Sequence, residues 1–88
     1  MTRRMTLPRF YFDVQEGTRF TADEVGLEVD SVDAAEYEAA RAAAEMGRDQ
    51  LPNGDACNVT IAVRDERRQQ VVTVRVAMEV YRNEPAHR

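Results

Sequence analysis

The chain has 88 residues and a formal net charge of −4 at pH 7, so it has room for one domain with one small core. No apolar run approaches the ~20 residues of a membrane span, no secretory leader is evident, and the single cysteine, Cys57, excludes an intramolecular disulfide. We therefore expect a cytoplasmic protein. With a pI near 4.9 and no basic stripe, the composition argues against a nucleic-acid partner.

The first predicted elements are short strands. Residues 1–7 show no periodicity and predict an N-terminal arm, which ends before Pro8. "RFYFDV" then alternates apolar and polar residues, as a half-buried strand does, and the "QEG" that follows predicts a turn. "TRFT" resumes the alternation to complete a hairpin, and "VGLEV" predicts a third short strand through Leu27.

The segment "DSVDAAEYEAARAAAEMGRDQL" predicts one helix. Asp33 is the expected N-cap, with Glu36 as its capping-box partner, and Ser31 is the alternative cap. A stripe of mostly small residues at helical spacing predicts close packing on a sheet; its members are Ala35, Ala39, Ala42 and Met46. Residues 52–54, "PNG", are expected to stop the helix.

"NVTIAVRDERRQQVVTVRVAMEV" predicts a second hairpin with its loop near residues 66–69. The order of elements predicts an α+β two-layer sandwich, in which an antiparallel sheet of two hairpins and a short extra strand carries one helix on one face. We expect one domain over residues 8–82 and a tail over 83–88. The predicted core comprises Phe10, Phe12, Leu27, Ala35, Ala39, Met46, Ile61, Val63, Val74 and Val76.

No catalytic, cofactor or metal residues emerge from the sequence. The carboxylates of "FDVQEGTRFTADEVG" are out of register for a calcium loop, because Gly17 and Thr18 fall at its fifth and sixth positions. The only histidine, His87, lies near the C-terminus, away from any partner for nucleophilic catalysis, and no phosphate-binding glycine motif occurs. A carboxylate-dependent enzyme remains the lower-ranked alternative to a non-catalytic protein.

Two surfaces are candidate interfaces, and both would serve a homodimer. The sheet face opposite the helix is expected to carry an unusually apolar set, Tyr11, Ala62, Ala77 and Tyr81. The outer face of the helix carries small residues beside a tyrosine, namely Tyr37, Ala40, Ala44 and Gly47. Arg64 and Arg75 are expected on facing strands of the second hairpin, with Arg67 and Arg68 at the loop tip. These arginines either bind a phosphate or an acidic partner, or are paired by nearby acids.

The chain resembles an uncharacterised family of short bacterial proteins, frequent in rhizobia and related alpha-proteobacteria, that is grouped as a domain of unknown function. "PRFYFDV", the "EG" turn, "DEVGLEVDSVDAAEYEA", "RDQLPNGD" and "VRDERRQQVVTVRVAMEV" carry the resemblance across nearly the whole chain. Similar proteins usually have an Asp-Gly or comparable turn where this chain has Arg67-Arg68. The family implies no activity, cofactor or catalytic residue.

A looser resemblance covers residues 12–39, "FDVQEGTRFTADEVGLEVDSVDAAEYEA", which look like the N-terminal domain of HicB-type antitoxins. That resemblance implies binding to a small basic protein. Residues 13–49, with a formal charge of −8, would suit such a partner. The sequence alone leaves three hypotheses open: a self-associating interaction module, a domain that binds a basic protein and, ranked lower, a carboxylate-dependent enzyme.

Overall fold

The computed structural model describes residues 6–50 and 56–83, with side chains described over 6–49 and 58–83. In chain order its elements are β1 (Arg9–Glu16), β2 (Arg19–Thr21), β3 (Leu27–Glu28), α1 (Val32–Gln50), β4 (Ala56–Arg64) and β5 (Gln70–Glu79). The predicted helix stop at 52–54 lies outside the described residues, as do most of the predicted N-terminal arm and C-terminal tail.

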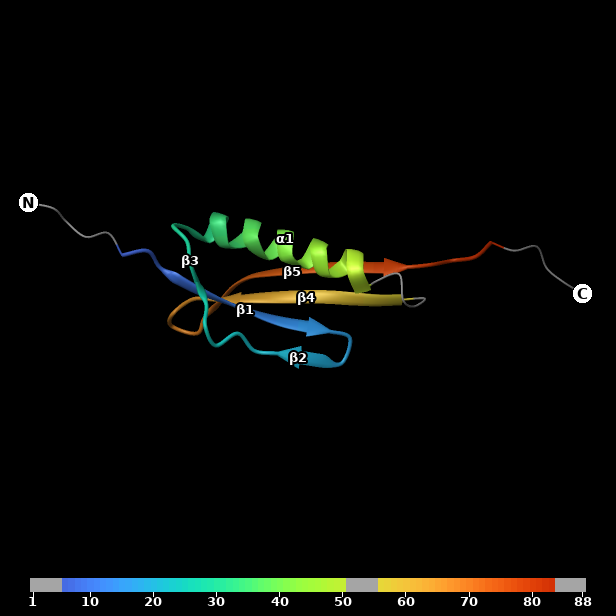
Figure 1. Ribbon diagram of the computed structural model, residues 1–88, viewed down its shortest axis with the longest axis horizontal. Helices are drawn as coiled ribbons and strands as arrows, with labels where there is room; N and C mark the ends of the chain where they lie inside the picture. The colour runs from blue at the N-terminus through green and yellow to red at the C-terminus, as the bar shows by residue number, and fades with distance from the viewer. Residues whose placement is uncertain (1–5, 51–55, 84–88) are drawn as a thin grey trace, which may run out of the picture.

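All strand pairs are antiparallel, and the strand order is β2-β1-β4-β5 with β3 also paired to β1. Figure 1 shows α1 lying along one face of this sheet, over β4 and β5. The predicted α+β architecture of two hairpins and one helix is therefore confirmed. Its bounds as a single domain over 8–82 stay a prediction.

The free edge of β1 is shared by two short strands. β2 pairs with Val14–Glu16 and β3 pairs with Arg9 and Phe10, so the chain from 19 to 28 follows β1 as one strand with an interruption at 22–26. Gly26 sits in this interruption with φ of 79°, where a Cβ would lie 2.8 Å from the Cγ of Arg9. Glycine is required there because the left-handed conformation and the close approach both exclude a side chain.

The core is small and lies between α1 and the middle of the sheet. Ala35, Ala39 and Ala43 are fully buried at a spacing of one helical turn and face the fully buried Val59, Ile61 and Val63. Alanine allows the helix backbone to approach the strands closely, but each alanine contributes little apolar area. Phe10 is the one aromatic side chain buried in this cluster within the described residues.

Three local predictions are wrong. Leu27 is 43% exposed, because α1 covers β4 and β5 rather than the edge where β3 lies. The N-cap is Ser31, whose Oγ accepts a 3.0 Å hydrogen bond from the N–H of Ala34, so Asp33 falls within the first helical turn. Gly47 is buried, so it does not belong to the outer stripe of the helix.

The turn between β4 and β5 is organised by Asp65. Its carboxylate accepts the N–H groups of Arg67 (2.8 Å) and Gln69 (2.9 Å), and its carbonyl accepts the N–H of Arg68. Arg68 adopts φ of 68°, the conformation that an Asp-Gly turn would give to glycine. The register then shifts after Val63, and both β4 and β5 stay antiparallel beyond this bulge.

Candidate functional site

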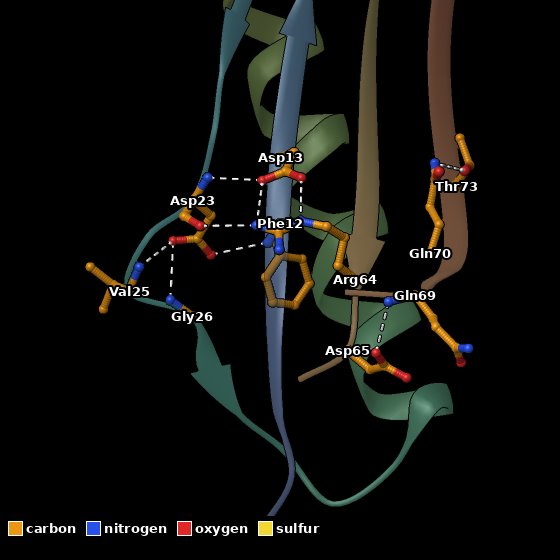
Figure 2. Close-up of polar contacts among 10 residues, drawn as sticks. All are labelled: Phe12, Asp13, Asp23, Val25, Gly26, Arg64, Asp65, Gln69, Gln70 and Thr73. Atoms are coloured by element: carbon orange, nitrogen blue, oxygen red, sulfur yellow. Dashed lines mark hydrogen bonds and ion pairs between the residues drawn. The ribbon is translucent and has the colours of Figure 1, made fainter. Parts of the chain in front are cut away.

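Asp13 is the one buried charged side chain among the described residues, although it lies on the sheet face away from α1. Its carboxylate accepts hydrogen bonds from Nε and Nη2 of Arg64, at 2.6 and 3.1 Å, and from the backbone N–H of Asp23 at 2.9 Å. Figure 2 shows these three donors converging on Asp13. The loop at 22–26 and the side chain of Arg64 together cover the carboxylate, and Asp13 as a whole is 9% exposed.

Asp23 closes the gap between β2 and β3. Strand β1 directs the N–H of Phe12 toward this edge, where neither short strand reaches it, and Asp23 Oδ2 accepts that N–H at 3.0 Å. The other carboxylate oxygen accepts the N–H groups of Val25 and Gly26 at 3.0 and 3.1 Å. Arg64 Nη2 completes the connection by donating to the carbonyl of Asp23 at 3.2 Å.

The two carboxylates are held ionised by different groups. Hydrogen bonding from Arg64 lowers the pKa of Asp13 below its ordinary value of 3.8, against the opposing effect of burial. Burial alone would raise the pKa of Asp23, but the N–H donors of Phe12, Gly26 and Val25 outweigh it and lower the pKa. The hydrogen bond to Asp13 raises the pKa of Arg64. Through these hydrogen bonds the two carboxylates link the loop at 22–26 to β1 and β4.

A groove of about 420 Å³ opens beside the ion pair; it is lined by Tyr11, Asp23, Glu24, Arg64, Asp65, Glu66 and Arg68. The guanidinium carbon of Arg64 lies 5.1 Å from the centroid of the Tyr11 ring, which helps to hold Arg64 in place. Four acidic side chains and two arginines line the groove; Arg64 is already paired with Asp13, so the acids outnumber the remaining arginine, Arg68. The groove therefore suits a basic group better than a phosphate.

Arg64 and Arg75 lie on the paired strands β4 and β5, as expected, but they are not directly opposite each other. Arg64 is opposite Gln70, whereas Arg75 is opposite Thr60, four residues further along β4. The two arginines share the open sheet face but do not form one cluster. An anion site built from both is not supported by this register.

The remaining predicted interface residues are exposed on two separate surfaces. Ala77 and Arg75 lie on the open face of β5, and Tyr81, which follows the strand, is 76% exposed. Tyr37, Ala40 and Ala44 are exposed on the outer side of α1. Neither surface brings these residues into the groove beside Tyr11 and Arg64.

Sequence reasoning missed two contributors to the open face. Phe20 pairs with Gln15 in the register of β1 and β2, which places it on that face with 59% exposure. The second is Asp23, whose carboxylate accepts the N–H of Phe12 in the gap between β2 and β3 and whose own N–H donates to Asp13. The spacing "TADEVG", with an aspartate three residues before a glycine, was the one signal of such a loop.

Within residues 6–49 and 58–83, no three histidine, cysteine or acidic side chains gather as metal ligands do. In the same part of the chain, no helix combines the length and the apolar character needed to cross a membrane.

Within the described residues, the chain forms a small α+β fold with one helix on one sheet face, an open opposite face, and on that open face an ion pair between β1 and β4. The chain belongs to the family described as domain of unknown function DUF6894, whose model matches residues 9–77. The predicted membership of an uncharacterised domain family is thereby confirmed. No curated protein and no solved structure matches the chain at a significant level.

Proposed function

We propose that this protein is a small, non-catalytic interaction module that associates with itself as a homodimer. The main observation in favour of this proposal is that α1 covers only one face of the sheet. Within the described residues the opposite face has no second layer, and it exposes Phe20, Ala77 and the adjoining Tyr81. A sheet face without a covering layer and with exposed aromatic side chains is typical of a contact surface.

The size of the core gives an energetic reason for association. Three of the seven buried core residues within the described chain are alanine, and the largest fully buried side chains there are Ile61, Val59 and Val63. Burying a valine or isoleucine contributes about 1.5–3 kcal/mol, so this core leaves a narrow margin over the entropy cost of folding. Association with a second copy would add buried area that the single chain lacks.

Sedimentation of the full chain at micromolar concentration tests the proposal. We expect the mass of a dimer, together with a melting temperature that rises with protein concentration because folding and association are linked. A protein that sediments as a monomer up to millimolar concentration, and melts at a concentration-independent temperature, would refute self-association.

A second candidate function is the binding of a small basic protein, as the looser resemblance to antitoxin domains implies. The observation in its favour is the acidic rim of the groove, formed by Asp23, Glu24, Asp65 and Glu66. A pull-down from the native host, comparing the natural chain with the Glu24→Gln/Glu66→Gln variant, tests it. Capture of a basic protein by the natural chain alone is the expected result, and equal capture by both would remove the groove from consideration.

A further inference from the structure

The outer edge of β5 is the longest unpaired strand edge in the described part of the chain. β5 runs for ten residues, Gln70–Glu79, and pairs with β4 on one side only. Natural proteins usually protect such edges with proline, a bulge or a covering segment. β5 has no proline, and its bulge lies at its first residues, so the stretch from 72 to 79 is regular and open to pairing.

The backbone of β5 presents its odd-numbered residues to this edge. The N–H of Gly17 donates to the carbonyl of Asn58, so the backbone N–H and C=O groups of even-numbered β4 residues point toward β1. Because these groups alternate along a strand, those of odd-numbered β4 residues point toward β5. In the register of β4 with β5, Val59 is opposite Val76 and Ile61 is opposite Val74. The backbone N–H and C=O groups of even-numbered β5 residues therefore bond to β4. The N–H and C=O groups of 73, 75, 77 and 79 must then point outward.

One register of β5 with a second antiparallel β5 matches both charge and hydrophobicity. With a two-fold axis at Ala77, Arg75 is opposite Glu79 of the second copy, and Glu79 is opposite Arg75 of that copy. On the helix side, the same register places Val76 opposite Met78 of the second copy and Val74 opposite Val80 of that copy. Opposite charges and apolar pairs at directly facing positions both stabilise an antiparallel ladder.

Neighbouring registers lack this match. An axis at Arg75 would place the two arginines opposite each other, which is unfavourable, and an axis at Val76 would place Arg75 opposite Ala77 without an ion pair. Within the described residues no carboxylate lies within ion-pair distance of Arg75 in the single chain, so its charge is available to a partner. Val80, 49% exposed in the single chain, would be covered by the facing strand.

We propose that a second copy of this chain pairs with β5 through its own β5, antiparallel about Ala77, to form one continuous sheet with both copies of α1 on the same face. This inference rests on the proposed function, because both require a homodimer; the contact that it names runs along the edge of β5, where Ala77 and Tyr81 lie, rather than across the open face. The joined sheet would leave the groove beside Arg64 free in both copies.

Charge reversal tests the register. Arg75→Glu changes the formal net charge from −4 to −6, and Glu79→Arg changes it from −4 to −2. The register predicts that each variant raises the dimer Kd roughly tenfold, since each replaces two attractive pairs with two repulsive ones. The double variant Arg75→Glu/Glu79→Arg should return the Kd to near that of the natural chain. A response to total charge alone would instead give opposite effects for the two single variants.

Arg19→Glu is the matched control. It makes the same change in net charge as Arg75→Glu but lies on β2, at the other edge of the sheet, with its side chain 79% exposed. We expect its dimer Kd to equal that of the natural chain within about twofold, because surface charges remote from an interface are screened.

Disulfide formation tests the axis directly. In a Cys57→Ser background, Ala77→Cys would place two thiols on residues that exchange hydrogen bonds across the axis, with Cα atoms about 5.5 Å apart, a distance that a disulfide spans. The control Thr73→Cys lies on the same strand and face, but its Cα would be about 27 Å from that of its mate. Mild oxidation should give a covalent dimer of the first variant and no covalent cross-link in the second.

The results separate the inference from the function on which it rests. A dimer that is weakened by both single reversals, restored by the double variant and cross-linked through position 77 supports the β5 register. A dimer that none of these changes affects overturns the register but leaves the proposed function standing. A protein that stays monomeric throughout overturns both.

Discussion

Removal of the Asp13 carboxylate is expected to destabilise the fold more than any other single change to a charged residue described here. Asp13→Ala takes away the acceptor of three hydrogen bonds, two from Arg64 and one from the N–H of Asp23. It leaves the guanidinium of Arg64, whose side chain is 26% exposed, without its carboxylate partner, and it frees the loop that carries Asp23.

The magnitude follows from the burial of the pair. Breaking a fully buried pair costs about 3–5 kcal/mol, and breaking an exposed pair costs about 0–1 kcal/mol. Asp13 and Arg64 lie between these limits, with side-chain exposures of 11% and 26%. We expect Asp13→Ala to lower the free energy of unfolding by about 3 kcal/mol, Arg64→Met by about 2 kcal/mol, and the double variant by about 3 kcal/mol. The coupling energy is then about 2 kcal/mol.

Urea unfolding followed by far-ultraviolet circular dichroism, at one protein concentration for all variants, measures this cycle. Glu28→Gln provides the comparison, because it breaks the 2.8 Å pair of Glu28 with Arg9, whose side chains are 49% and 35% exposed. That variant should lose no more than about 0.5 kcal/mol. A coupling energy between Asp13 and Arg64 below about 0.5 kcal/mol would refute the structural role assigned to this pair.

The other predictions concern acid, glycine, the helix cap and calcium. Because the pKa of Asp13 is lowered in the folded state, the stabilisation that this carboxylate gives the fold is present above the ordinary value of 3.8 and is lost as the pH falls through the folded pKa. Urea unfolding in that acid range should show a smaller loss of unfolding free energy for Asp13→Asn than for the natural chain. Gly26→Ala should destabilise by more than 1 kcal/mol beyond Gly17→Ala, since both glycines have positive φ but only Gly26 is crowded by neighbouring atoms; equal thermal shifts would contradict this. Ser31→Ala should cost about 1 kcal/mol and Asp33→Ala less than half of that, and the reverse order in thermal melts would return the cap to Asp33. Melting temperatures in EDTA and in excess calcium should agree, and a calcium-induced rise of several degrees that is lost in Asp13→Asn would show a cation site.

The elements themselves could be predicted because their signals are local. Alternation through Phe10, Phe12 and Val14 predicts a strand with one buried face, and a stripe of alanines at helical spacing predicts a helix that packs closely on a sheet. Side-chain direction repeats every two residues in a strand and about every 3.6 in a helix, whatever the element packs against. The family resemblance could also be seen in the sequence, because the same local segments carry it.

The pairs of residues that form the site depend on which strands are neighbours in the sheet. No local sequence pattern gives that information. Asp13 and Arg64 are 51 residues apart in the chain and meet because β1 pairs with β4 in one register. Shifting that register by one residue would send every side chain of β1 to the other face. Leu27 alternates like a core residue but is exposed, because α1 settles over β4 and β5 where its alanines fit closely. The open edge of β5 has the same origin: the strand order leaves its outer N–H and C=O groups unpaired, and that order is set by the packing of the whole chain.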